Sequence, residues 1–133
     1  MSQALLIRLA ALLGALSVAL GAFAAHGLRD LVGEAYLLTF ETAVRYQFYH
    51  ALAIGLAAAV YPAEQVSQRR LGWAVACWLG GILLFSGSLY LLSLREVHGL
   101  PVAFLGPITP LGGLLLIAGW VLLLISPRRP ADR

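Results

Sequence analysis

Apolar residues dominate this chain in four long stretches, and short polar segments separate them. The stretches run over residues 5–25, 43–61, 71–94 and 107–125. A helix needs about 20 mostly apolar residues to cross the hydrocarbon core of a bilayer, and each stretch is close to that length. The pattern therefore predicts an all-α protein, a four-helix transmembrane bundle with both ends of the chain on one side of the membrane.

The first stretch also admits a second interpretation. Arg8, the apolar run after it and the triplet Ala22-Phe23-Ala24 are arranged like a secretory signal peptide with its cleavage site. Small residues recur at helical spacing within the same stretch, at Ala10, Gly14, Ser17 and Gly21. Such a stripe lets membrane helices approach closely, whereas a segment that is removed has no need of one, so we favour a retained span.

The segment between the first two spans has the pattern of an amphipathic helix. Its apolar residues recur at the spacing of one helical face, at Leu28, Leu31, Val32 and Ala35. Charged residues fall on the opposite face, at Arg29, Asp30 and Glu34. We therefore expect a connector that lies along the outer membrane surface before the second span begins.

Pro and Gly interrupt the segment GLPVAFLGPITP before the last span, so irregular backbone is expected there. Thr109 followed by Pro110 has the form of a helix start, with Thr109 as the N-cap, and Pro107 is an alternative start. Irregular backbone at membrane depth must lie against protein or water. We therefore expect residues 106–109 to fold into the outer mouth of the bundle, close to Ser86 and Tyr90.

Composition identifies the bilayer as the solvent of this protein. Hydrophobic residues make up 61% of the 133 residues, charged residues only 11%, and the mean hydropathy is +0.89. A soluble domain of this size could not bury so much apolar surface. Residues 1–133 are therefore interpreted as a single integral membrane domain. The lone cysteine, Cys77, lies in an apolar run and is expected to be a buried, inert thiol.

The arginines indicate the orientation. All nine basic residues are Arg, and they give no basic run with interleaved aromatics, so no nucleic-acid partner is expected. Six arginines fall on the side of the chain ends: Arg8, Arg69, Arg70, Arg128, Arg129 and Arg133. Three fall on the other side: Arg29, Arg45 and Arg95. Since cytoplasmic segments carry the excess of positive charge, both termini are predicted to be cytoplasmic.

Polar side chains collect at the outer ends of the spans, and the inner halves are nearly free of them. The candidate residues of an outer-half polar pocket are His26, Glu41, Thr42, Arg45, Tyr46, Tyr49, His50, Ser86, Ser88, Tyr90 and Thr109. An unpaired charge at the centre of a membrane helix costs roughly 3 kcal/mol or more, so these groups should face inward. Glu41 and Arg45 stand at i, i+4 in the favourable order and are expected to neutralise each other.

Two roles fit these residues. They can hold the helices together by hydrogen bonds, or they can line a pocket that binds a lipid, a small solute or the helix of a partner membrane protein. The alternative function is a small-solute or proton-coupled transporter or channel that uses Glu41, Arg45 and His50. The apolar inner halves offer one copy no continuous path, although small-residue faces on the first and third spans would permit a homo-oligomer.

Enzymatic and cofactor chemistry are not expected. The chain contains no G-x-S-x-G, H-E-x-x-H or P-loop pattern. A metal or haem site would need His26, His50 and His98, and no two of them have the ligand spacing of one helix. We therefore expect no metal, no cofactor and no catalytic residues.

Four segments resemble the motifs of the domain of unknown function 423 family. They are GAFAAHGL (21–28), ETAVRYQFYHALA (41–53), FSGSLYLL (85–92) and GPITPLGG (106–113), in the family's order and over nearly the whole chain. The resemblance implies a four-helix integral membrane protein, located in bacteria in the inner membrane. It implies no activity, and no catalytic residue carries over from it.

Overall fold

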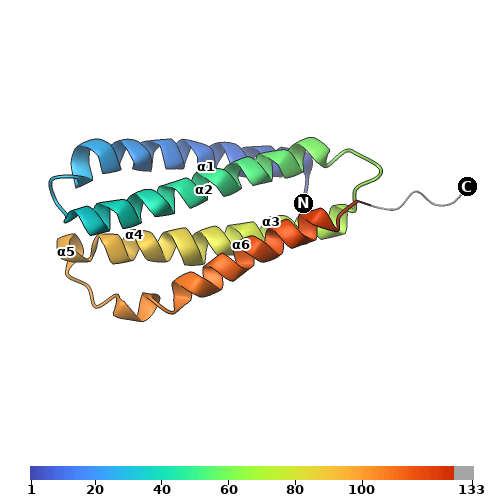
Figure 1. Cartoon of the computed structure of the whole chain (residues 1–133). Helices are drawn as coiled ribbons and strands as arrows, with labels where there is room; N and C mark the ends of the chain where they lie inside the picture. The colour runs from blue at the N-terminus through green and yellow to red at the C-terminus, as the bar shows by residue number, and fades with distance from the viewer. Residues whose placement is uncertain (128–133) are drawn as a thin grey trace, which may run out of the picture.

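The computed structural model describes residues 1–127, and over this range it consists of helices and connecting turns without a β-strand (Figure 1). The elements in chain order are α1 (Gln3–Phe23), η1 (Ala24–Leu28), α2 (Glu34–Val60), α3 (Gln68–Gly81), η2 (Ile82–Ser86), α4 (Gly87–Ser93), α5 (Arg95–His98), η3 (Ala103–Leu105) and α6 (Ile108–Leu124). The all-α prediction is thus confirmed for the described residues.

Three helical rods are long and apolar enough to cross a membrane: Gln3–Leu28, Gln68–Ser93 and Ala103–Leu124. They overlap the first, third and fourth of the predicted spans. Two of the rods contain a π-helical turn, η1 at the end of the first and η2 in the middle of the second. The second predicted span lies in α2, which is 27 residues long but does not qualify by composition.

The predicted amphipathic connector is wrong. The chain stays helical through Leu28, turns tightly, and enters α2 at Glu34, so no separate surface helix forms. Backbone hydrogen bonds from Leu31 and Val32 to the Leu28 carbonyl close the turn, and Gly33 is the N-cap of α2. Leu28 and Val32 are buried, but Leu31 is 59% exposed, because a turn cannot keep the spacing of a helical face.

The three rods and α2 pair as two antiparallel hairpins that lie side by side (Figure 1). The first consists of α1 and α2, the second of the α3–η2–α4 rod and α6, which crosses that rod obliquely. Met1 and Pro127 lie at one end of the molecule with the linker 61–67, and the 29–33 turn and α5 lie at the other. Arg128, Arg129 and Arg133, used above for orientation, lie outside the described residues.

Small residues bring the helices of each hairpin together. In the first hairpin, Gly21 faces Val44 and Gly55 faces Ala10, with Ser17 buried between these contacts. In the second hairpin the approach is closer. A Cβ atom on Gly112 would overlap the backbone nitrogen of Phe85 in η2. Two further contacts of this kind join Gly81 to Leu116 and Gly119 to Trp78.

The last helix begins before Thr109, at the alternative start, with Pro107 as its N-cap. It starts at Ile108, so Thr109 lies in its first turn, where its hydroxyl contacts the Ser88 hydroxyl at 2.7 Å. Thr109 therefore packs against the bundle, as expected. Gly106 and Pro107 are exposed, and the prediction that they fold into the outer mouth is wrong. The 3₁₀ turn η3 carries the chain around the outside instead.

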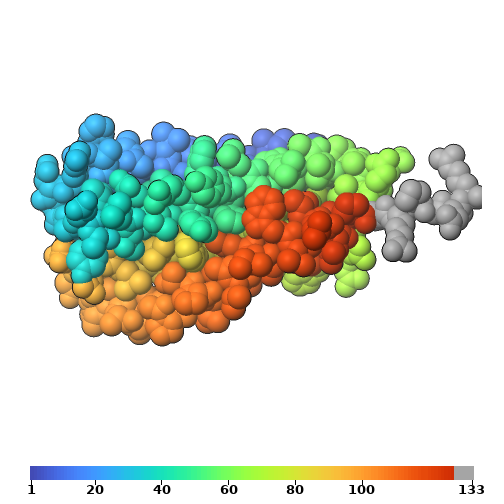
Figure 2. Space-filling view, viewed as in Figure 1, coloured from blue at the N-terminus to red at the C-terminus, as the bar shows by residue number. Residues whose placement is uncertain are grey.

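Large apolar side chains cover the outside of the molecule. Ile7 and Val18 on α1, Leu83 on η2, and Leu114 and Leu124 on α6 are each more than half exposed. Figure 2 shows one such face, on which α2 and α6 diverge toward the end that carries α5. Apolar surface on this scale is expected where the surroundings are lipid rather than water.

Replacing Gly112 with Ala should destabilise the protein by about 1–3 kcal/mol, because the new methyl group meets backbone that cannot move aside. Gly113→Ala is the matched control, since a Cβ there meets the Phe85 ring at 3.7 and 3.8 Å, an ordinary contact. Thermal unfolding of both variants in one detergent provides the measurement. Equal melting temperatures for the two would contradict the close crossing of α6 over η2.

Candidate functional site

The structure distributes the predicted polar residues over a buried hydrogen-bonded interior and an exposed face of α2. Gln47 is the centre of the interior and is only 5% exposed. Its Nε2 donates to the Leu13 carbonyl at 3.3 Å, and its Oε1 accepts from the Tyr90 hydroxyl at 3.1 Å. Since these partners belong to α1 and α4, one amide joins three helices.

Gln47 was not among the predicted pocket residues, although the sequence held a signal for it. It is in phase with Ala43, Ala51 and Ile54, which form the buried face of α2 at a spacing of three or four residues. Tyr90 was predicted, and its ring also packs on Phe40 with centroids 4.8 Å apart. Its hydroxyl donates a hydrogen bond to Gln47 inside the bundle.

His50 joins α2 to α6 by a second set of buried hydrogen bonds. It is 4% exposed, and its Nδ1 lies 2.7 Å from the Tyr46 carbonyl, to which it donates. The indole N–H of Trp120 donates to His50 Nε2 at 3.1 Å. The geometry requires a neutral ring with its proton on Nδ1, and it leaves neither nitrogen available to a metal or a substrate.

Two tryptophans at this junction were missed by sequence reasoning. Trp78 is fully buried, and its ring lies 5.2 Å from that of Trp120 and 6.5 Å from that of His50. Trp78 Nε1 has no hydrogen-bond partner among the described residues. Both tryptophans stand in uncharged apolar runs, so nothing in the local sequence distinguished them from residues that face lipid.

The predicted serines fall at the junction of the α3–η2–α4 rod with α6. Ser88 donates to the Phe85 carbonyl at 2.9 Å and contacts Thr109 at 2.7 Å. Ser86 is fully buried in η2, and its hydroxyl has no partner in the described part of the chain. The hydroxyls of Ser88 and Thr109 therefore hold the first turn of α6 against the rod.

The predicted ion pair between Glu41 and Arg45 is wrong. Arg45 is exposed, and its Nη2 donates to the Thr42 hydroxyl at 3.1 Å. Glu41 is half-buried, and no ion pair joins these two described residues. The guanidinium leans toward the start of α2, and of the two groups that lie there the Thr42 hydroxyl at i−3, not the Glu41 carboxylate at i−4, accepts its hydrogen bond.

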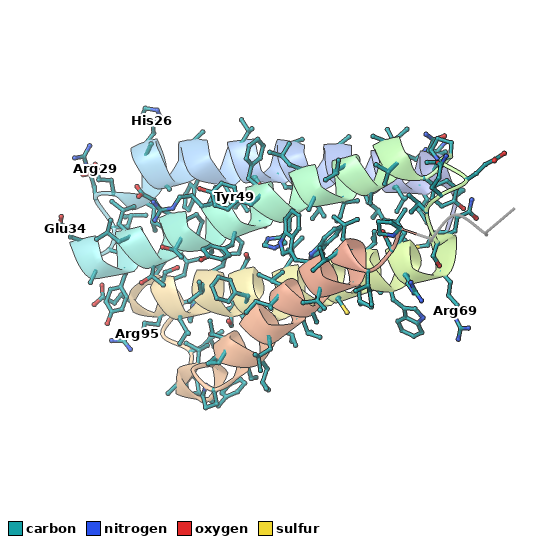
Figure 3. All side chains as sticks on the ribbon, turned by 45° about the vertical axis from the view of Figure 1, so that its right-hand side comes forward. His26, Arg29, Glu34, Tyr49, Arg69 and Arg95 are labelled. Atoms are coloured by element: carbon teal, nitrogen blue, oxygen red, sulfur yellow. The ribbon has the colours of Figure 1, made fainter. Side chains whose placement is uncertain are left out.

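Arg45 borders an apolar groove between the first two helices. This α1/α2 groove encloses about 190 Å³ and is lined by Ser17, Val18, Val44, Arg45, Phe48 and Tyr49. Tyr49 is 54% exposed, and Figure 3 shows its place along α2. The groove thus has a cation and a phenol ring at its edge and hydrocarbon along its walls.

A second groove opens between α2, η2 and α6. This α2/α6 groove encloses about 290 Å³ and is lined by Tyr46, His50, Phe85, Gly113, Leu116, Ile117 and Trp120. Tyr46 is 40% exposed, and its ring packs on that of Phe85 with centroids 4.7 Å apart. Because the hydrogen bonds of His50 are already made, this groove is apolar in character.

The other titratable residues lie apart from both grooves. His26 is exposed and points away from the bundle (Figure 3). His98 holds the turn after α5, with Nε2 2.9 Å from the Leu91 carbonyl and Nδ1 accepting from the Leu100 N–H. Within residues 1–127 no group of three His, Cys, Asp or Glu is placed to hold a metal. Cys77 is half-buried, not buried as predicted.

Comparison with known proteins connects this geometry to a family. Residues 20–113, which include every predicted pocket residue, match the family described as "Protein of unknown function (DUF423)". The "UPF0382 membrane protein SH2409" of Staphylococcus haemolyticus is 41% identical over 122 residues, 92% of this chain and 93% of the relative. The "UPF0382 membrane protein YwdK" of Bacillus subtilis is 40% identical over 124 residues, 90% of this chain and 93% of the relative.

A eukaryotic relative shows a similar identity. The "UPF0382 membrane protein C1782.12c" of Schizosaccharomyces pombe is 40% identical over 118 residues, which cover 87% of this chain and 95% of the relative. No solved structure matches the chain. The names of these relatives describe membrane proteins and print no substrate, ligand or reaction.

Proposed function

This chain belongs to the DUF423 family of membrane proteins, and from that premise we propose that it is a non-enzymatic, lipid-binding protein of the inner (plasma) membrane. The proposal includes a fourth membrane crossing by α2 and a cytoplasmic location of both termini. Its ligand is an anionic phospholipid, held by Arg45 at the edge of the α1/α2 groove.

Packing supports the crossing by α2. This helix runs antiparallel to α1 (Figure 1), and 27 residues at about 1.5 Å each exceed the thickness of the hydrocarbon core. Its buried polar residues, Gln47 and His50, are hydrogen-bonded to other helices. A helix that shields its polar groups in this way can cross with its neighbours, although its composition alone is not apolar enough.

Arg45 is the observation that carries the lipid proposal. It is an exposed cation on a face of α2 that also presents Phe48, Tyr49 and Leu52. Its guanidinium donates a hydrogen bond to the neutral hydroxyl of Thr42. A guanidinium in this position can reach the membrane interface and form two parallel hydrogen bonds with a phosphate. The apolar α1/α2 groove beside it would receive the acyl chain of the same molecule.

The alternative of a transporter receives less support from the described residues. Gln47 bonds to Leu13 and Tyr90, and both nitrogens of His50 are bonded, to Tyr46 and to Trp120. Arg45 faces outward, away from this interior. A path for a polar solute would have to break these bonds within a bundle whose core around Ile54, Val75 and Trp78 is closely packed.

The proposed topology predicts opposite labelling of the segments before and after α2. In a background without Cys77, a cysteine at Gly33 in the outer turn should react with an impermeant thiol reagent added from outside. A cysteine at Gln68, the first residue of α3, should be protected until the membrane is opened. Labelling of Gln68 and protection of Gly33 would reverse the orientation, and labelling of both from outside would mean that α2 does not cross.

Arg45→Gln should weaken binding of phosphatidylglycerol about ten- to a hundredfold, since a hydrogen-bonded charge contributes roughly 1.5–3 kcal/mol. Arg45→Lys should retain part of the affinity, because the charge remains without the two-point geometry. Native mass spectrometry of the detergent-solubilised protein, titrated with phosphatidylglycerol or phosphatidylcholine, measures this directly.

Arg8→Gln is the matched control. Arg8 is an exposed arginine at the opposite end of the bundle, and its removal should leave most of the phosphatidylglycerol affinity intact. If the Arg45→Gln protein bound phosphatidylglycerol as well as the wild type does, lipid recognition by Arg45 would be excluded.

A further inference from the structure

The two grooves lie on either side of one narrow ridge. Arg45 and Tyr49 border the α1/α2 groove, and the neighbouring residues Tyr46 and His50 border the α2/α6 groove. Successive residues of a helix point about 100° apart, so the two grooves are neighbours on the surface of α2. The rings of Tyr46 and Tyr49 lie across the ridge, with centroids 6.1 Å apart.

Building on the lipid-binding function proposed above, we infer that the ligand is a phospholipid with two acyl chains that straddles this ridge. Its phosphate lies at Arg45, one chain occupies the α1/α2 groove, and the other occupies the α2/α6 groove.

The polar chemistry of the two grooves differs, and this assigns the headgroup and the second chain. At the α2/α6 groove, both nitrogens of His50 are bonded, to Tyr46 and to Trp120, so an occupant finds no ring nitrogen to bind. Apart from the phenol of Tyr46 at its edge, the lining by Phe85, Leu116 and Ile117 suits hydrocarbon. At the α1/α2 groove, Arg45 supplies the positive charge that a phosphate requires.

The direction of the side chains gives the lipid a consistent orientation. Helical side chains lean toward the N-terminus of their helix, which for α2 is the proposed outer end. Arg45 follows this rule, since its guanidinium reaches back to Thr42. A phosphate placed at Arg45 therefore lies on the outer side of both grooves, and two chains descending from it would run toward the membrane centre along α2.

The test compares the binding of two-chain and one-chain lipids to a variant in which a larger side chain fills the α2/α6 groove. Gly113 lines the α2/α6 groove, and a Cβ there meets the Phe85 ring only at ordinary contact distances, so Gly113→Leu can be accommodated while its side chain occupies the groove. Gly72→Leu is the control, because a Cβ on Gly72 in α3 meets nothing within 4 Å and Gly72 borders neither groove. The probes are dioleoyl and lyso-oleoyl phosphatidylglycerol, and native mass spectrometry measures the binding of each to the detergent-solubilised protein.

The wild type should bind the two-chain lipid more tightly than the one-chain lipid. Gly113→Leu should remove most of that preference, roughly a tenfold loss for the two-chain lipid, with the one-chain affinity nearly unchanged. Gly72→Leu should behave as the wild type. Should Gly113→Leu fail to fold, Ile117→Trp fills the same groove from a side chain that is already 61% exposed.

Three outcomes would overturn the inference or its premise. If filling the groove leaves the two-chain preference intact while Arg45→Gln weakens both lipids, the straddling arrangement is wrong and the lipid-binding function stands. If filling the groove changes only the oligomeric state, the groove receives a helix of a second copy. If Arg45→Gln affects neither lipid, the proposed function itself is wrong.

Discussion

The hydrogen bonds of Gln47 set the constraint on which the rest of the structure depends. An amide inside a membrane bundle finds no water, so both of its ends must be bonded to protein. Gln47 meets this requirement with Leu13 on α1 and Tyr90 on α4. These bonds fix the rotation of α2 about its axis, and that rotation determines which other side chains of α2 are buried and which are exposed.

The same rotation places His50 toward α6 and leaves Arg45 exposed on the outside of the bundle. His50 stands three positions after Gln47 and Arg45 two positions before it, which puts His50 near the buried side of α2 and Arg45 on another side. His50 then closes its own bonds with Tyr46 and Trp120. The polar residues are thus sorted into a bonded interior and an exposed face, and a cation on that face is the basis for proposing lipid recognition.

The sequence predicted the elements better than the contacts between them. Runs of apolar residues located the rods, because the length needed to cross a bilayer is set by simple geometry. The start of α2 was missed, because Leu28, Leu31, Val32 and Ala35 recur at the spacing of a surface helix, whereas the chain turns after Leu28 and α2 begins at Glu34. The ion pair of Glu41 with Arg45 was predicted from spacing alone, and spacing does not show that Thr42 offers a nearer acceptor. Trp120 and the α2/α6 groove depend on how remote segments meet, which no local pattern records.

The central claim is that Arg45 is presented to the membrane and is not neutralised by Glu41. A double-mutant cycle with Glu41→Gln and Arg45→Gln, followed by thermal unfolding in detergent, tests it most directly. The structure predicts that the two changes add, with a coupling energy below about 0.5 kcal/mol, as for residues without a shared interaction. A favourable coupling of about 1 kcal/mol or more would show that the two charges pair in the folded protein, and Arg45 would then no longer be available to a phospholipid.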